Sequence, residues 1–141
     1  MSDVAGGIIL PAYTDGPAES FATTLQFDWT RPPLSMNDNF DRFKTRKLIK
    51  EIRAAGEAAA SRIPALGKCR LTLTWFVVDK RRRDAINICA TFKPLADGIV
   101  DAGVVFDDAP AYMDTPMPTI VWLDKKLGHV AHMELRIEMV S

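Results

Sequence analysis

Cysteine and histidine are scarce in this chain of 141 residues, which contains two of each. Two cysteines cannot build a disulfide framework, so we interpret Cys69 and Cys89 as reduced, small core residues. His129 and His132 invite a metal interpretation, but on an extended segment their spacing points them to opposite faces. No cysteine or third histidine lies near them, which argues against a zinc site.

The sequence also lacks long apolar runs and the common nucleotide-binding motifs. Its longest apolar runs, such as residues 71–78, are far too short to span a bilayer. The N-terminus has no basic region followed by an apolar core, and no repeat, heptad, Walker loop or dinucleotide fingerprint is present. We therefore expect a cytoplasmic protein with no membrane contact and no organic cofactor.

Net charge is absent as well, since 18 Lys and Arg residues balance 18 Asp and Glu residues. That total conceals a segregation of charge. Residues 31–83 carry 14 basic residues against five acidic ones, whereas residues 1–20 and 101–114 carry acids and no base. Because a local basic patch decides whether a polyanion can bind, nucleic acid is a candidate partner.

Length and composition predict one globular domain. A chain of 141 residues with 48% hydrophobic and 26% charged residues can bury a core, but it is too short for two ordinary domains. Residues 1–20 contain turn residues and no lasting period, so we expect a loose N-terminal arm there. Residues 8–10 could add an edge strand to it. Residues 21–141 then form the single domain.

Alternation of polar and apolar residues predicts four strands. They lie at residues 23–29, 69–78, 119–123 and 130–140. The last two are joined through residues 124–128, and their spacing and charge suggest a hairpin. Trp29, Trp75 and Trp122 fall in these strands, so we expect them in the core rather than as platforms for stacking bases.

Two helices are expected as well. Residues 38–61 are amphipathic, and one arc of this helix is a basic ridge. The ridge consists of Arg42, Arg46, Lys50 and Arg53. An ordinary solvated face and a phosphate-binding surface are both open interpretations of it. The second helix lies within residues 86–101, where Pro94 either marks its start near Lys93 or kinks it, and Gly103 fits its C-terminal stop.

The first strand and the first helix are separated by a loop. Pro32 and Pro33 end the strand, and Ser35, Asn37 and Asp38 are good helix caps. Together these elements predict an α/β domain of the α+β kind. We expect a mixed sheet of about four strands with two helices packed on it.

Chemically reactive side chains follow the end of the second long strand. In chain order they are Arg81, Arg82, Arg83, Asp84, Asn87, Lys93, Asp97, Asp107 and Asp108. Singly, each has an ordinary explanation as a cap, a turn or a solvated residue. Together they favour a site, because strand ends and loops present chemistry on a rigid scaffold. Carboxylates beside cations suit Mg²⁺ and a phosphate, since Mg²⁺ takes oxygen ligands while the cations hold the anion.

In this order the residues resemble the RusA-like Holliday junction resolvases, which are often encoded by phages. The resemblance runs from about residue 25 to the C-terminus, includes the PP-x-S-x-N segment at 32–37, and is densest over residues 81–108. The family signature is Asp-x-Asp-Asn, followed by a lysine and an Asp-Asp pair. By position, the resemblance implies catalytic roles for Asp84, Lys93 and Asp108.

The resemblance implies a Mg²⁺-dependent endonuclease that resolves four-way DNA junctions, with Mn²⁺ as a possible substitute. Asp84, Asp107 and Asp108 would hold the metal ion, and Lys93 would stabilise charge on the phosphate. The implied DNA contacts are Arg42, Arg46, Lys50, Arg53, Arg81, Arg82, Arg83 and Asn87. A four-way junction has two-fold symmetry and needs paired cuts, so the resemblance also implies a homodimer.

One position departs from the family signature. Ile86 stands where the second aspartate belongs, and an isoleucine cannot ligate a metal ion. An alternative is therefore a catalytically impaired relative that binds branched DNA without cutting it. A third interpretation, an enzyme acting on a small phosphorylated substrate, would leave the basic ridge without a role.

Overall fold

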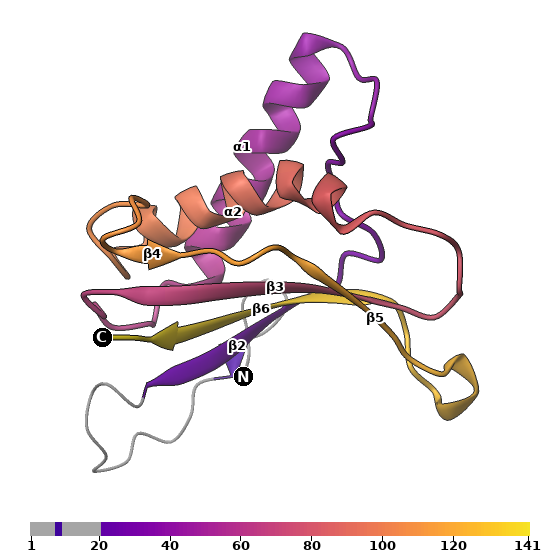
Figure 1. Cartoon of the computed structure of the whole chain (residues 1–141). Helices are drawn as coiled ribbons and strands as arrows, with labels where there is room; N and C mark the ends of the chain where they lie inside the picture. The colour runs from indigo at the N-terminus through magenta and orange to yellow at the C-terminus, as the bar shows by residue number, and fades with distance from the viewer. Residues whose placement is uncertain (1–7, 10–20) are drawn as a thin grey trace.

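A mixed β-sheet carries two helices on one face in the computed structural model, which describes residues 8–9 and 21–141 (Figure 1). The strands are β1 (Ile8–Ile9), β2 (Ala22–Phe27), β3 (Cys69–Val77), β4 (Met113–Asp114), β5 (Thr119–Trp122) and β6 (His132–Met139). The helices are α1 (Arg42–Ala59) and α2 (Cys89–Asp101), with 3₁₀ turns η2 (Ala85–Ile88) and η3 (Lys125–Leu127). The predicted mixed sheet with two helices is confirmed.

Strand β3 lies at the centre of the sheet. It pairs antiparallel with β6 along one edge and parallel with β4 and β5 along the other, and β6 continues to β2 and β1. The predicted hairpin of β5 and β6 is wrong, because β3 lies between them. The turn at residues 124–128 is a local signal, whereas pairing with β3 adds the buried side chains Leu71, Leu73 and Leu135 to one core.

Helix α1 begins four residues later than its sequence pattern predicts. Asp41 is its N-cap, and the Asp41 carboxylate accepts a hydrogen bond from the backbone N–H of Lys44 at 2.8 Å. Asp38 instead accepts from the backbone N–H of Ser35 at 2.8 Å, so it stabilises the preceding loop. The prediction that Ser35, Asn37 and Asp38 cap the helix is therefore wrong, because these residues bond within their own turn.

Helix α2 lies within the predicted range, begins at Cys89 and continues through Pro94, so the alternative of a start near Lys93 is wrong. The η2 turn leads directly into it, and its buried face, which includes Phe92 and Leu95, holds it against the core. Gly103 follows the helix with a φ of 87°, as expected for a C-terminal stop.

The two helices approach each other closely at two glycines. A Cβ atom built on Gly98 would lie 2.2 Å from the carbonyl oxygen of Arg53, and one built on Gly56 would lie 2.8 Å from the carbonyl oxygen of Leu95. Both neighbours are backbone atoms, which cannot move aside as a flexible side chain can. These glycines therefore fix the distance between α1 and α2, and with it the position of the residues on both helices.

Strands β1 and β5 lie at the edges of the sheet. Residues 8–9 form the edge strand β1, and the rest of the expected loose arm lies outside the described residues. Trp29 and Trp75 pack against the core as expected, but Trp122 is 45% exposed because β5 runs along the sheet edge.

Both cysteines are free, and burial raises the pKa of Cys69 to about 11. No helix within residues 8–9 and 21–141 is both long and apolar enough to cross a membrane.

Candidate functional site

The loop after β2 is bound to the beginning of α2, although the two are far apart in sequence. The Thr91 hydroxyl donates to the carbonyl oxygen of Leu34 at 2.6 Å and accepts from the Leu34 N–H at 3.1 Å, across 57 residues. The Met36 N–H donates to the carbonyl oxygen of Asn87 at 3.0 Å. These bonds join the proline-containing loop and the Asp84 segment into two walls of one hollow.

This hollow, the arginine cavity, has a volume of about 600 Å³. Its charged and amide-bearing lining residues are Arg31, Arg81, Arg82, Arg83, Asp79, Asp84, Asn37 and Asn87. Four guanidinium groups therefore meet two carboxylates at the end of β3. A cavity lined in this way suits a phosphate group, because one guanidinium group can donate two parallel hydrogen bonds to two phosphate oxygens.

The four arginines are not equally available to a ligand. The Arg83 guanidinium donates to the Asp79 carboxylate at 2.7 Å and lies 4.8 Å from the centre of the Trp75 ring, and its side chain is only 16% exposed. The backbone N–H of Arg81 and the Arg83 guanidinium together lower the pKa of Asp79. Arg82 has no ion pair within the described part of the chain. Arg83 thus holds the loop, while Arg82 is free to bind an anion.

Asp84 is an exposed carboxylate at the beginning of η2. Its side chain makes no capping hydrogen bond, and its carbonyl oxygen accepts from the backbone N–H of Asn87 at 3.1 Å. Ile86, in the same turn, is 53% exposed. The structure therefore brings Asp84, Asn87 and the three predicted arginines to one cavity, which Ile86 does not line.

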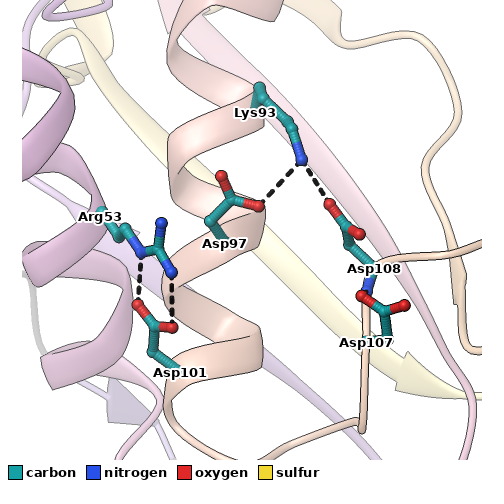
Figure 2. Close-up of polar contacts among 6 residues, drawn as sticks. All are labelled: Arg53, Lys93, Asp97, Asp101, Asp107 and Asp108. Atoms are coloured by element: carbon teal, nitrogen blue, oxygen red, sulfur yellow. Dashed lines mark hydrogen bonds and ion pairs between the residues drawn. The ribbon is translucent and has the colours of Figure 1, made fainter.

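Lys93 forms a second group of charges with Asp97, Asp107 and Asp108, which we call the Lys93 cluster (Figure 2). Its ammonium donates to Asp97 at 2.9 Å and also to Asp108, whose backbone N–H donates to Asp107 at 2.8 Å. The bonds to Asp108 and Asp97 raise the pKa of Lys93, and Lys93 in turn lowers the pKa of Asp108. The predicted site residues Lys93, Asp107 and Asp108 are thus neighbours.

The Lys93 cluster and Asp84 belong to different cavities. Lys93 and Asp108 line a second, mostly apolar cavity of about 370 Å³, whose walls include Phe92, Met113 and Met117. No described residue lines both cavities. The structure does not bring Asp84 and Asp108 into a shared pocket.

The predicted magnesium site can be tested against this arrangement. Within residues 8–9 and 21–141, no three His, Cys, Asp or Glu side chains are grouped so that they could hold a metal ion. The Lys93 ammonium is bonded to Asp108, where a metal ion would compete with it. Asp84, Asp107 and Asp108 in this arrangement therefore do not fit a Mg²⁺ or Mn²⁺ ion.

The basic ridge on α1 divides into free and paired residues. Arg42, Arg46 and Lys50 are exposed and have no ion pair among the described residues. Arg53 differs, because its guanidinium binds both oxygens of Asp101 on α2 at 2.5 and 2.8 Å (Figure 2). This bond raises the pKa of Arg53 and lowers the pKa of Asp101. Arg53 therefore ties the two helices together instead of adding to the free charge.

Several cavity residues were not assigned to the site from sequence. Arg31 and Asp79 line the arginine cavity, as do Ser35 and Asn37, which their sequence context suggested as helix caps. The sequence did indicate a loop at this point, because paired prolines rarely occur within a helix or a strand. Pattern alone could not show that this loop returns to the end of β3, since β6 lies between β2 and β3.

The ion pair of Lys93 with Asp108 makes a prediction about pH. In a Lys93→Met variant the pKa of Asp108 should rise toward the ordinary value for an aspartate, because the largest cause that lowers it is removed. Because the folded-state pKa of Asp108 is lowered, the pair stabilises the fold above the ordinary pKa, and this contribution is lost as pH falls through the lowered one. Carboxyl ¹³C NMR titration measures both values. Asp101, held by Arg53, should keep its lowered pKa in the same variant, and an unshifted Asp108 would contradict the pairing.

The geometry above is the basis for assigning a function, because comparison with known proteins adds none. A scan of protein-family models finds no family that matches the chain, and a search of curated proteins finds no match either.

Proposed function

We propose that this protein is a RusA-like endonuclease that resolves four-way DNA junctions in recombination and repair. Because Asp84 and Asp108 line separate cavities here, metal-dependent cutting would require the two carboxylates to come together when DNA binds. One observation carries the proposal. The two segments on which the sequence resemblance rests, residues 32–37 and 81–87, are distant in the chain but form the walls of one arginine-lined cavity. The cavity places the exposed carboxylate of Asp84 beside four guanidinium groups, of which that of Arg82 has no ion pair among the described residues, and this is a suitable arrangement for a DNA phosphate.

Three groups of cations would contact DNA, namely those of the arginine cavity, the basic ridge and Lys93. Arg31, Arg81 and Arg82 would bind a phosphate in the arginine cavity, and Arg83 keeps the loop in place through Asp79. The basic ridge would bind neighbouring phosphates, which position DNA without reading its sequence. Lys93 would bring its positive charge to a phosphate once released from Asp108.

A second candidate function is binding of branched DNA without cleavage. Two observations favour it. Ile86 replaces a carboxylate of the family signature, and Asp84 and Asp108 line separate cavities. The arginine cavity and the basic ridge have the same role under this candidate, because they bind phosphate and take no part in metal chemistry. Both candidate functions therefore predict that the protein binds junctions, and only the first predicts that it cleaves them.

The proposal extends to assembly and location. A junction has two-fold symmetry, so a homodimer would place one site at each of two symmetric cuts. The place of action would be the cytoplasm of a bacterial cell or of a phage-infected host. An enzyme for a small phosphorylated substrate is less well supported, because it leaves the free cations of α1 without a ligand.

Incubation of labelled four-way junctions with Mg²⁺ or Mn²⁺ tests the proposal. Wild-type protein should make paired, symmetric cuts, and Asp84→Asn should lower the cleavage rate at least about 100-fold. Ile86→Asp should raise the rate, because a carboxylate there adds an oxygen ligand. Asp114→Asn is a matched control, because its carboxylate lines neither cavity, and it should cut as the wild type does.

The outcomes separate the two candidates. Binding by the wild type with cutting only by Ile86→Asp establishes the second candidate. Cutting that persists in Asp84→Asn removes Asp84 from the site. Failure of the wild type to bind junctions at all contradicts both candidates.

A further inference from the structure

Phe43 is a large apolar side chain left almost entirely in solvent. It lies in the first turn of α1 and is 81% exposed. Figure 1 shows this end of α1 standing away from the sheet, so the fold offers the ring no surface to pack against. A phenylalanine in this position contributes nothing to the core, and its role has to be sought outside the fold.

The charges on the first half of α1 itself are all positive, and the one acid beside Phe43 is the N-cap Asp41, whose carboxylate is bonded to the backbone N–H of Lys44. The first half of α1 carries five basic residues, and no acid occurs in this helix before Glu51. These five residues are Arg42, Lys44, Arg46, Lys47 and Lys50. Lys44 lies over the ring of Phe40, with its Nζ 4.0 Å from the ring centre, which leaves the ring of Phe43 uncovered. A ligand for this surface is therefore anionic and also presents an apolar face.

The loop between β2 and α1 connects this surface to the arginine cavity. The loop that carries Arg31 along the cavity leads directly into the N-cap of α1 (Figure 1). The Met36 N–H in this loop donates to the carbonyl oxygen of Asn87. Met36 and Ile86 are exposed on this path. A single polyanionic ligand could therefore contact the cavity and the tip of α1 together.

We propose that Phe43 stacks on a base at the branch point of a DNA junction, while the cations of α1 bind the flanking phosphates. This inference rests on the proposed function and adds the residue that recognises the branch. DNA has both required properties, since its phosphates are anionic and an unstacked base offers a flat apolar face. Apolar side chains are inserted between base steps by proteins that kink or open DNA.

A second copy of the chain is a poorer occupant of this surface. In a symmetric contact the same face meets itself, so five cations would oppose five cations. Unpaired like charges at a contact cost free energy that one exposed phenylalanine ring does not offset.

A junction with 2-aminopurine beside its branch point tests the proposal. Wild-type protein should raise the 2-aminopurine fluorescence, because the base leaves its stack. Phe43→Ala should abolish that rise and weaken junction binding roughly 5- to 150-fold, with duplex binding unchanged. Phe43→Trp should retain both properties, since its ring can stack. Leu127→Ala is the control, because Leu127 is 74% exposed on the distant η3 turn.

Three outcomes would overturn the proposal, and they are distinguishable. Junction binding and fluorescence that are unchanged in Phe43→Ala remove Phe43 from recognition and leave the proposed function intact. Equal loss of junction and duplex binding indicates a general contact rather than a branch contact. A smaller mass of Phe43→Ala in sedimentation, with unchanged fluorescence, assigns the ring to a contact between copies.

Discussion

Replacing Gly98 with alanine should lower the free energy of unfolding by about 3 kcal/mol, the upper end of the cost of overpacking. The new Cβ would lie 2.2 Å from the carbonyl oxygen of Arg53 and 2.9 Å from the backbone nitrogen of Glu57. Both are backbone atoms of α1, so the two helices have to separate. Denaturation in urea, monitored by circular dichroism, measures the loss.

The sign of this effect is what makes the experiment decisive. Helix propensity alone favours alanine over glycine by about 1 kcal/mol in a helix interior. Ala58→Gly on the exposed side of α1 measures that term in this protein, and it should cost about 1 kcal/mol. A stabilised Gly98→Ala variant would show that the helices do not approach at this glycine.

Replacing Arg42, Arg46 and Lys50 together with alanine should weaken binding to a DNA junction by on the order of 100-fold. These side chains are exposed and have no ion pair among the described residues, so each is free to release a counterion from a phosphate. The logarithm of affinity against the logarithm of salt concentration should lose about 1 in slope for each contact removed. Fluorescence anisotropy between about 50 and 200 mM salt measures both quantities.

Two control proteins separate this effect from a general loss of charge. Lys125→Ala with Lys126→Ala removes two exposed cations from the η3 turn, and it should leave the slope unchanged. Arg53→Ala breaks the bond to Asp101, so it should lower stability more than it changes the slope. An equal loss of slope in the lysine variant and the α1 variant would contradict a DNA surface on α1.

Local pattern was sufficient to predict most elements of this fold. Period-two alternation located β2, β3, β5 and β6, and the apolar arcs located both helices. Pattern was insufficient where a distant partner decides the outcome. The turn at residues 124–128 suggests a hairpin, but both flanking strands pair with β3. Pro94 suggests a break in α2, but the buried Phe92 and Leu95 hold the helix on the core.

Sequence alone predicted which neighbouring residues form the candidate site, but it did not predict that Asp84 and Asp108 line separate cavities. Sequence order placed Asp84, Asn87 and the arginines together, and all of them line the arginine cavity. Asp84 precedes α2 and Asp108 follows it, and a helix of 13 residues is about 20 Å long. The chain turns back after Gly103 only far enough for Asp108 to reach Lys93.

Competition between a four-way junction and a duplex of the same sequence tests the central claim most directly. The measurement uses wild-type protein at about 150 mM salt without a divalent metal, so that binding is observed apart from cutting. We predict at least about tenfold preference for the junction, with affinity for both DNAs falling as salt rises. Equal affinity for the two DNAs, or binding that does not change with salt, would contradict it.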